Sequence, residues 1–343
     1  MPPPQICVIG SLNIDFVTYT PRCPAAGETL TAAALAISAG GKGANQAVAC
    51  GRASFAAPDS QDASVAMIGA VGADDPYYAA LLRPTLEGSG VSTRGVQERT
   101  DSQTGSATII VEEAARGENR ILVVPGANHT GMDQVDAVLA RTQGLLHSHL
   151  EGVVLLQGEI PRATTLRLMK HFNDPACRAH LVFNPAPVFP EGIPLPALAG
   201  TSVLAMNETE AVLMTHSVAD HLRPGQNAAE LDPDELAPLF HHHAQVHIVL
   251  ITLGAKGAYF STATGKRGFA PSAAVEKVVD TTAAGDTFVG YFATAFARFV
   301  ATGAPLPEFD AHIESAVRRA NLAAAGCVQR KGAMQSIPFA YEI

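Results

Sequence analysis

Short apolar segments alternate with longer helix-like segments along most of this chain. The strand-like segments, rich in β-branched residues and leucine, cover residues 6–9, 65–71, 152–157, 181–184, 202–206 and 247–252. Helical patterning covers residues 43–53, 75–88, 133–147, 162–172, 208–215, 234–243, 286–300 and 311–329. Repetition of strand, helix and strand predicts a parallel sheet with helices on both faces. We therefore predict one three-layer α/β/α domain over residues 1–343, with a mostly parallel central sheet.

Two regions depart from this alternation. Residues 14–39 and 104–124 contain strand-like stretches without helices, and the second resembles a hairpin around residues 115–118. Together they predict a small antiparallel β-sheet that stands off the main domain as a lid. An edge meander of the main sheet is the alternative. Residues 54–63 and 217–233 are predicted to be exposed loops.

Composition excludes several classes of function. The chain carries 23 basic and 32 acidic residues, a formal charge of −9, which argues against binding to nucleic acid. No apolar run reaches the roughly 18–20 residues that span a bilayer, so we expect no membrane partner. The N-terminus leads directly into a strand and does not resemble a signal peptide. Five scattered cysteines without a paired motif predict a reduced, cytoplasmic protein, and they do not exclude a nuclear location.

The segment from Val279 to Phe288 carries the clearest chemical signal. Three small residues, Ala283, Ala284 and Gly285, precede Asp286 at the start of an apolar helix. Small residues let the backbone approach a ligand, and the free N–H groups of a helix start favour an anion. A carboxylate base beside an anion site is what phosphoryl transfer to a hydroxyl requires.

Other polar residues follow the predicted strands, at the edge where ligands bind in parallel sheets. Asn13 and Asp15 follow the first strand and could hold sugar hydroxyls, or could serve only in a turn or cap. The segment Gly40–Gln46 opens a helix and allows close approach of a ligand, or is a plain glycine-rich turn. It matches neither the Walker A spacing nor the dinucleotide fingerprint, which argues against an oxidoreductase using nicotinamide.

Three further segments end strands in the same way. Glu159 follows the strand that ends near Gln157, and Asn207–Glu210 follows the next-but-one strand. Glu210 could hold Mg²⁺ through water, and the same four residues also fit the start of a helix. The segment Thr252–Gly257 suits a turn beneath a nucleotide with Lys256 near phosphate, or a hairpin turn into the next strand.

Taken in order, these segments resemble the ribokinase family of carbohydrate kinases, which also includes adenosine kinase and fructokinase. The resemblance covers nearly the whole chain and rests on residues 10–15, 40–46, 184–187, 207–210, 250–254, 280–286, 330–333 and 336–338. The segment Gly40–Gln46 is more particular to ribokinases than to the wider family, so the resemblance implies D-ribose as the acceptor and ATP as the donor.

The resemblance also implies roles for individual residues. Asp286 would be the base, and the backbone at Ala283, Ala284 and Gly285 would form the anion hole. The residues implied to hold the sugar are Asn13, Asp15, Gly41, Lys42, Asn45, Glu159 and Asp286. Those implied to line the ATP site are Asn207, Thr252, Gly254, Ala255, Lys256, Gly257, Gly285 and Asn321.

Two cations and a dimer are implied as well. Mg²⁺ would accompany ATP near Glu210. A monovalent activator, K⁺, would be held mostly by backbone carbonyls of Asp280, Thr282, Cys327, Arg330, Gly332 and Ser336. A homodimer would form through the lid sheet.

Three alternatives to a ribokinase remain. A deoxyribokinase or a nucleoside kinase of the same family would differ little in sequence, since a 2-hydroxyl is a small feature. A sugar-binding regulator without catalysis could use the same scaffold, although it would have no need of Asp286.

Overall fold

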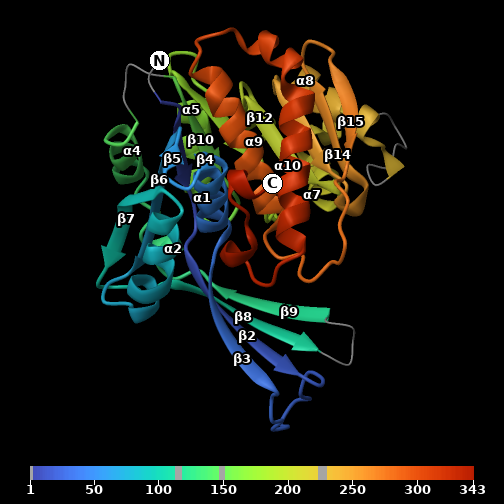
Figure 1. Ribbon diagram of the computed structural model, residues 1–343. Coiled ribbons are helices and arrows are strands. Elements are labelled where there is room, and N and C mark those ends of the chain that lie inside the picture. The colour runs from blue at the N-terminus through green and yellow to red at the C-terminus, as the bar shows by residue number, and fades with distance from the viewer. Residues whose placement is uncertain (1–2, 113–117, 147–150, 223–229) are drawn as a thin grey trace.

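The computed structural model describes residues 3–112, 118–146, 151–222 and 230–343, and its largest element is a nine-stranded sheet (Figure 1). The strand order is β15-β14-β13-β12-β11-β10-β1-β6-β7. The strands are β1 (Gln5–Ile9), β6 (Ser64–Gly72), β7 (Val91–Arg99), β10 (Gly152–Leu156), β11 (Ala179–Phe183), β12 (Val203–Asn207), β13 (Ile248–Thr252), β14 (Gly257–Thr262) and β15 (Arg267–Pro271).

The sheet is parallel from β13 to β7, and β14 and β15 are added in antiparallel pairing. All six predicted strands are present and parallel. The hairpin alternative for residues 252–257 is confirmed by the β13–β14 pair. Alternate side chains of β1 enter two different cores, with Ile6 and Val8 on one face and Cys7 and Ile9 on the other. Both faces are therefore covered, which explains why the buried strands are continuously apolar.

Helices form the outer two layers (Figure 1). Buried residues of α1 (Lys42–Ala53), α2 (Arg83–Gly88), α9 (Ala284–Val300) and α10 (Ile313–Val328) belong to the first core. Those of α3 (Ala127–Thr130), α4 (Val135–Gln143), α5 (Arg162–Phe172), α6 (Leu195–Leu198), α7 (Glu208–Met214) and α8 (Pro233–Ala244) belong to the second. The predicted three-layer architecture is confirmed. Among the described residues, no helix combines the length and the apolar character needed to cross a bilayer.

A second, small sheet projects away from these layers, at the bottom of Figure 1. Its strand order is β3-β2-β8-β9, from β2 (Asn13–Thr20), β3 (Ala34–Gly40), β8 (Gly105–Glu112) and β9 (Glu118–Val124). The outer pairs are antiparallel as predicted, whereas the central pair, β2 with β8, is parallel. The alternative of an edge meander in the main sheet is wrong. The predicted turn at residues 115–118 lies largely outside the described residues.

Three local predictions need correction. Residues 54–63 are not a plain loop, because β4 (Phe55–Ala57) and β5 (Ser60–Gln61) pair as a short exposed hairpin. The helix predicted over residues 75–88 is present as a continuous helix over residues 76–88, but it contains a π-helical turn, η1 (Tyr78–Leu82), before α2. The predicted loop 217–233 overlaps a 3₁₀ helix, η3 (Thr215–His221), and residues 223–229 lie outside the described part of the chain.

The sheet reverses its direction of growth at β1, which has β6 on one side and β10 on the other. Ligands bind at the carboxyl ends of the strands beside such a switch point. Gly10, Gln157, Asn184 and Asn207 all stand at this edge, each at or just after the end of a strand. The order of the strands thus gathers polar residues that are far apart in the sequence.

Candidate active site

Asp286 lies in the first turn of α9, behind a backbone that turns sharply. Ala283, the residue before the helix, has φ 61 and ψ 7, in the left-handed region. Ala284 N–H donates to Thr281 O and Thr287 N–H donates to Ala283 O. Among the described residues, the intervening N–H groups of Gly285 and Asp286 have no backbone acceptor. The turn therefore offers two free donors next to a carboxylate.

The Asp286 carboxylate is held by two side-chain amides from α1. Asn45 Nδ2 donates to Asp286 Oδ2 over 3.0 Å, and Gln46 Nε2 donates to Oδ1 over 2.9 Å. The side chain is 7% exposed. Each amide occupies one lone pair of a carboxylate oxygen, which leaves further lone pairs free for a substrate hydroxyl.

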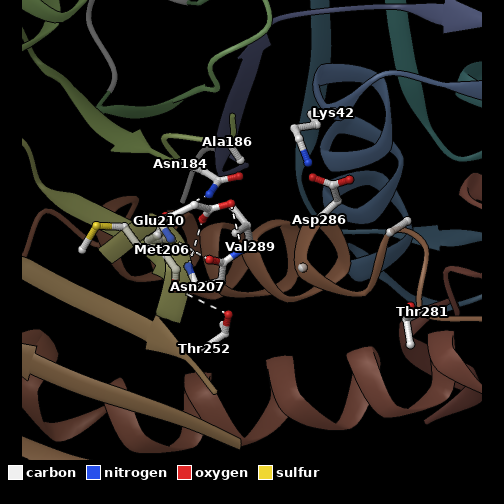
Figure 2. Close-up of a pocket in the computed structure, with 13 residues that line it drawn as sticks. Lys42, Asn184, Ala186, Met206, Asn207, Glu210, Thr252, Thr281, Asp286 and Val289 are labelled. Carbon is white, nitrogen blue, oxygen red and sulfur yellow. Dashed lines mark hydrogen bonds between the residues drawn. The ribbon is translucent and has the colours of Figure 1, made fainter. Parts of the chain in front are cut away.

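Lys42, the first residue of α1, points towards Asp286 (Figure 2). The negative charge of Asp286 raises the pKa of Lys42 despite the opposing effect of burial, and Glu159 and Glu210 add to the increase. Its ammonium group therefore stays protonated among three carboxylates. It supplies the local positive charge that an anionic ligand needs in this acidic protein.

Three of the sugar-binding residues implied by the resemblance, Asn13, Asp15 and Glu159, lie beside the chain that leads into α1. Asn13 Oδ1 accepts a hydrogen bond from Asn128 Nδ2 over 2.7 Å, which leaves the Asn13 amide nitrogen as the group available to a ligand. Glu159 Oε2 accepts from Lys42 N over 2.9 Å. Burial raises the pKa of Asp15 to about 7, and the charge of Glu159 contributes to this.

Gly41 packs tightly between these groups. It has φ 90, and a Cβ atom there would lie 2.8 Å from the backbone nitrogen of Asn13. Only glycine satisfies both conditions without strain. The close approach of a ligand at residues 40–46 stays a prediction.

Two cavities adjoin at Thr252, Thr281 and Gly285. The first, of about 220 Å³, is polar, and Figure 2 shows Lys42, Asn184, Asn207, Glu210 and Asp286 around it. The second, of about 620 Å³, is mostly apolar and is lined by the turn after β13, the segment after β15 and helix α10. A nucleotide has the same division, with charged phosphates at one end and a flat base at the other.

Most of the predicted ATP-site residues line one of these cavities. Asn207 lines the first, Thr252 and Gly285 line both, and the second is lined in addition by Gly254, Ala255, Gly257 and Asn321. Lys256 lines neither of them: its Nζ lies 3.4 Å from Glu208 Oε1, and the side chain is 73% exposed.

Glu210 forms the predicted helix start of α7. Its two carboxylate oxygens accept from Asn207 N and Asn207 Nδ2, both over 2.9 Å, and its own N–H donates to Asn207 Oδ1. Burial raises its pKa, whereas the Asn207 backbone and Lys42 lower it. The capping interpretation is confirmed, and Glu210 nevertheless lines the polar cavity.

The family to which the chain belongs follows from comparison with known proteins. The model of the pfkB family of carbohydrate kinases matches residues 3–340. The chain is a pfkB-family carbohydrate kinase.

Several proteins that are similar to this pfkB-family chain are named ribokinase or deoxyribokinase. It is 38% identical over 345 residues to a ribokinase of Schizosaccharomyces pombe, covering 99% of this chain and 96% of the relative. It is 30% identical to a deoxyribokinase of Salmonella typhi, covering 97% of this chain and 95% of that one. A solved structure of Arabidopsis thaliana ribokinase complexed with ribose and ATP is 28% identical, with a TM-score of 0.74 over 99% of this chain and 97% of that one.

In this pfkB-family chain five of the six residues implied for a monovalent cation lie on two adjoining loops, and the sixth, Cys327, is in the last turn of α10. Val279 and Asp280 both donate their N–H groups to Val328 O, over 2.8 and 3.2 Å. Cys327 Sγ lies 3.0 Å from Ser336 Oγ and 3.6 Å from Thr282 O. The remaining two residues, Arg330 and Gly332, follow on the second loop, and Gly332 N–H donates to Asp280 Oδ2.

Sequence reasoning missed three buried amides of the pfkB-family site: Gln46, Asn128 and Asn184. Gln46 is fully buried and contacts Asp286 directly, and Asn128 is 1% exposed beneath Asn13. Asn128 begins a triplet, Asn128-His129-Thr130, of the kind that accepts N-linked sugar, but its burial argues against that use. For Gln46 and Asn184 the available signal was their position in segments shared with the family, at the start of α1 and just after β11. Asn128, in α3, lies in none of those segments.

Proposed function

We propose that this chain transfers the γ-phosphoryl group of ATP to the 5-hydroxyl of D-ribose, giving D-ribose 5-phosphate and ADP. The observation that carries the proposal is the position of Asp286. It lines the polar part of a two-part cavity suited to a nucleotide, together with Lys42, whose N–H donates to the sugar-side residue Glu159. The names and ligands of the relatives described above support ribose and ATP as substrates.

Sugar binding would use complementary hydrogen bonds. The carboxylates of Asp15 and Glu159 would accept from sugar hydroxyls, whereas the Asn13 amide nitrogen would donate to one. Asn45 Oδ1 is buried and has no hydrogen-bond partner within the described part of the chain, so it would be a further acceptor for the sugar. Gly41 would allow the backbone to approach the ring.

Transfer would then depend on positioning and charge. The oxygen of the ribose 5-hydroxyl would bond to the γ-phosphorus while the bond between that phosphorus and the oxygen bridging to the β-phosphate breaks. Asp286 would accept the proton that the hydroxyl loses in this step. The free N–H groups of Gly285 and Asp286 and the Lys42 ammonium would stabilise the negative charge on the transferred group. The proton passes from Asp286 to solvent after product release.

Mg²⁺ fits the oxygen-rich wall of the polar cavity, where Asn184, Asn207 and Glu210 meet. When bound with ATP it neutralises phosphate oxygens, and Glu210 would reach it through water because its own oxygens also cap α7. K⁺ fits the loop pair, because carbonyl and hydroxyl oxygens of Asp280, Thr282, Arg330, Gly332 and Ser336 are suitable donors. Cys327 would contribute its carbonyl.

The small sheet would act as a lid that excludes water from the transfer. It also exposes apolar side chains, with Leu35 62%, Leu122 68% and Val124 59% exposed. We infer that these side chains form a homodimer contact. Light scattering tests this: the wild-type chain should be dimeric and Leu122→Glu monomeric, and a monomeric wild type would contradict it.

A cytoplasmic location is proposed as well, because the five cysteines are unpaired.

The substrate is tested by ADP release, coupled to an indicator reaction, with D-ribose, 2-deoxy-D-ribose, D-fructose and adenosine at equal concentrations. We expect the highest kcat/KM with D-ribose. The second candidate, a deoxyribokinase, rests on the 30% identical relative. A preference for 2-deoxy-D-ribose would establish it, and sugar binding without any ADP release would indicate a regulator.

A further inference from the structure

Gln46 occupies a position that the proposed mechanism does not yet use. It follows Asn45 on α1, is fully buried, and contacts the carboxylate of the proposed base. Its Nε2 donates to Asp286 Oδ1 and to Asn184 Oδ1, both over 2.9 Å. Its Oε1 accepts from Gln157 Nε2 over 2.7 Å. Both amide hydrogens and the carbonyl oxygen are therefore in use, and no water is needed to satisfy them.

The orientation of this amide is dictated from the main sheet. Asn184 Nδ2 donates to the backbone carbonyl of Ala205 on β12 over 2.9 Å, so Asn184 must turn its oxygen towards Gln46. Gln46 must then present its nitrogen, because its oxygen would face two acceptors, on Asn184 and Asp286. A rigid backbone group thus determines, through two side chains, which atom meets the base.

We propose that Gln46 and Asn184 are positioning residues of the transfer reaction and form an amide relay. In the relay, Ala205 O orients Asn184, Asn184 orients Gln46, and Gln46 fixes the rotation of the Asp286 carboxyl group. With Asn45 on the other oxygen, the carboxylate has one donor on each side. The inference rests on the proposed role of Asp286 as base.

The relay predicts that substitutions of Gln46 raise the pKa of Asp286, which a simple loss of packing would not do. Gln46→Glu keeps the shape of the side chain but places a second carboxyl group against Asp286 Oδ1. Two adjacent carboxylates do not both ionise readily, so the pKa of the base must increase. Gln46→Met removes the donor without adding a charge, and a smaller increase is expected.

The experiment measures kcat for ADP release from pH 5 to 9.5 at saturating ribose and ATP, and ribose binding by calorimetry without ATP. For Gln46→Glu we expect kcat at pH 7 to fall about 10²-fold and the acid limb of the profile to move up by roughly one pH unit or more. For Gln46→Met we expect a fall of about tenfold with a smaller move. The dissociation constant for ribose should stay within about threefold of the wild-type value in both variants, because neither substitution changes a residue that is proposed to contact the sugar.

Asn173→Asp provides a matched control. Asn173 Nδ2 also donates to a backbone carbonyl, Ala197 O, over 2.9 Å and to Thr201 Oγ1 over 3.0 Å, but it lines neither cavity. Asn173→Asp should have a lower melting temperature than the wild type, and the dependence of its kcat on pH should be unchanged. If Gln46→Glu does not fold, Asn184→Asp carries the same test, since it keeps the acceptor for Gln46 and adds a charge near Asp286.

The possible failures are distinguishable. No ADP release by the wild-type chain would overturn the proposed function and the relay with it. Wild-type turnover with full kcat in Gln46→Met, or with an unmoved acid limb in every relay variant, would overturn the relay alone. A parallel loss of ribose affinity and kcat would assign Gln46 a purely structural role.

Discussion

The Asp280 carboxylate accepts the N–H of Gly332 over 3.0 Å and so joins the loop before α9 to the loop after α10. Its other oxygen accepts from the N–H and the hydroxyl of Thr282. Burial opposes ionisation of Asp280, but these hydrogen bonds outweigh it and lower its pKa below the ordinary value. The carboxylate therefore holds together two loops that flank the start of α9, where the free N–H groups of the anion site lie.

Asp280→Ala is expected to remove activation by K⁺. Without the link to Gly332 the carbonyls of the two loops lose their common arrangement, and the anion site loses its support. We expect kcat in K⁺ to fall on the order of tenfold, to about the level that the wild-type chain shows with tetramethylammonium instead. Asp62→Ala is the control, because Asp62 pairs with Arg298 on the surface. A normal K⁺ response in Asp280→Ala would contradict the assignment.

Ribose affinity should decrease as the pH falls below about 7. Asp15 accepts hydrogen bonds from the sugar only when ionised, and burial, with the charge of Glu159, raises its pKa to about 7. Calorimetry from pH 5.5 to 8.5 is expected to show the weakest binding at the acid end. Asp15→Asn should bind roughly 10- to 150-fold more weakly at pH 8 and lose the pH dependence. An unchanged dependence in that variant would refute the role of Asp15.

The same pKa determines the sign of an effect on folding. The folded protein holds the Asp15 proton up to about pH 7, whereas the unfolded chain releases it near 3.8. The free energy of unfolding without ligand should therefore decrease as the pH rises from about 4 to about 7. Asp15→Asn removes this decrease in the free energy of unfolding. The melting temperature of the variant should therefore be higher than that of the wild type at pH 8, and the two should be closer at pH 5. The opposite order would show that Asp15 is ionised without ligand.

The features of the fold and the site that could be predicted from the sequence are those whose signal lies within one short segment. Buried parallel strands such as β10 are continuous apolar runs, and they could be predicted from the sequence alone. The edge strand β7 could not, because Val91–Arg99 mixes polar and apolar residues and is only partly buried. The place of Asp286 in the first turn of an apolar helix was predictable, because its small neighbours and its helix lie in one segment. Gln46 was not, because its partners come from three other elements, up to 240 residues away.

Gly43→Ala should disrupt the site, although alanine favours helices. Gly43 is on the first turn of α1, and a Cβ atom there would lie 2.5 Å from Ser11 N and 2.7 Å from the backbone carbon of Gly10. Backbone atoms cannot move aside, so we expect a loss of about 1–3 kcal/mol in the free energy of unfolding and weaker ribose binding. Gly88→Ala is the control, since nothing lies within 4 Å of its Cβ position at the end of α2. It should be neutral or stabilise by about 0.5–1 kcal/mol, and urea unfolding measures both.

Asp286→Asn should remove turnover and largely keep ribose binding. General base catalysis contributes about 10²- to 10⁴-fold, so kcat is expected to fall within that range at every pH. The new amide presents one nitrogen to a pair of donors, Asn45 Nδ2 and Gln46 Nε2, so one of these side chains must lose its partner or turn. Asp286→Ala separates the two effects, because it removes the base without placing a donor against donors. Equal kcat losses in the two variants, with ribose affinity within a few-fold of wild type, would identify the missing carboxylate as the cause. A variant of either kind that keeps wild-type kcat would exclude Asp286 as the base.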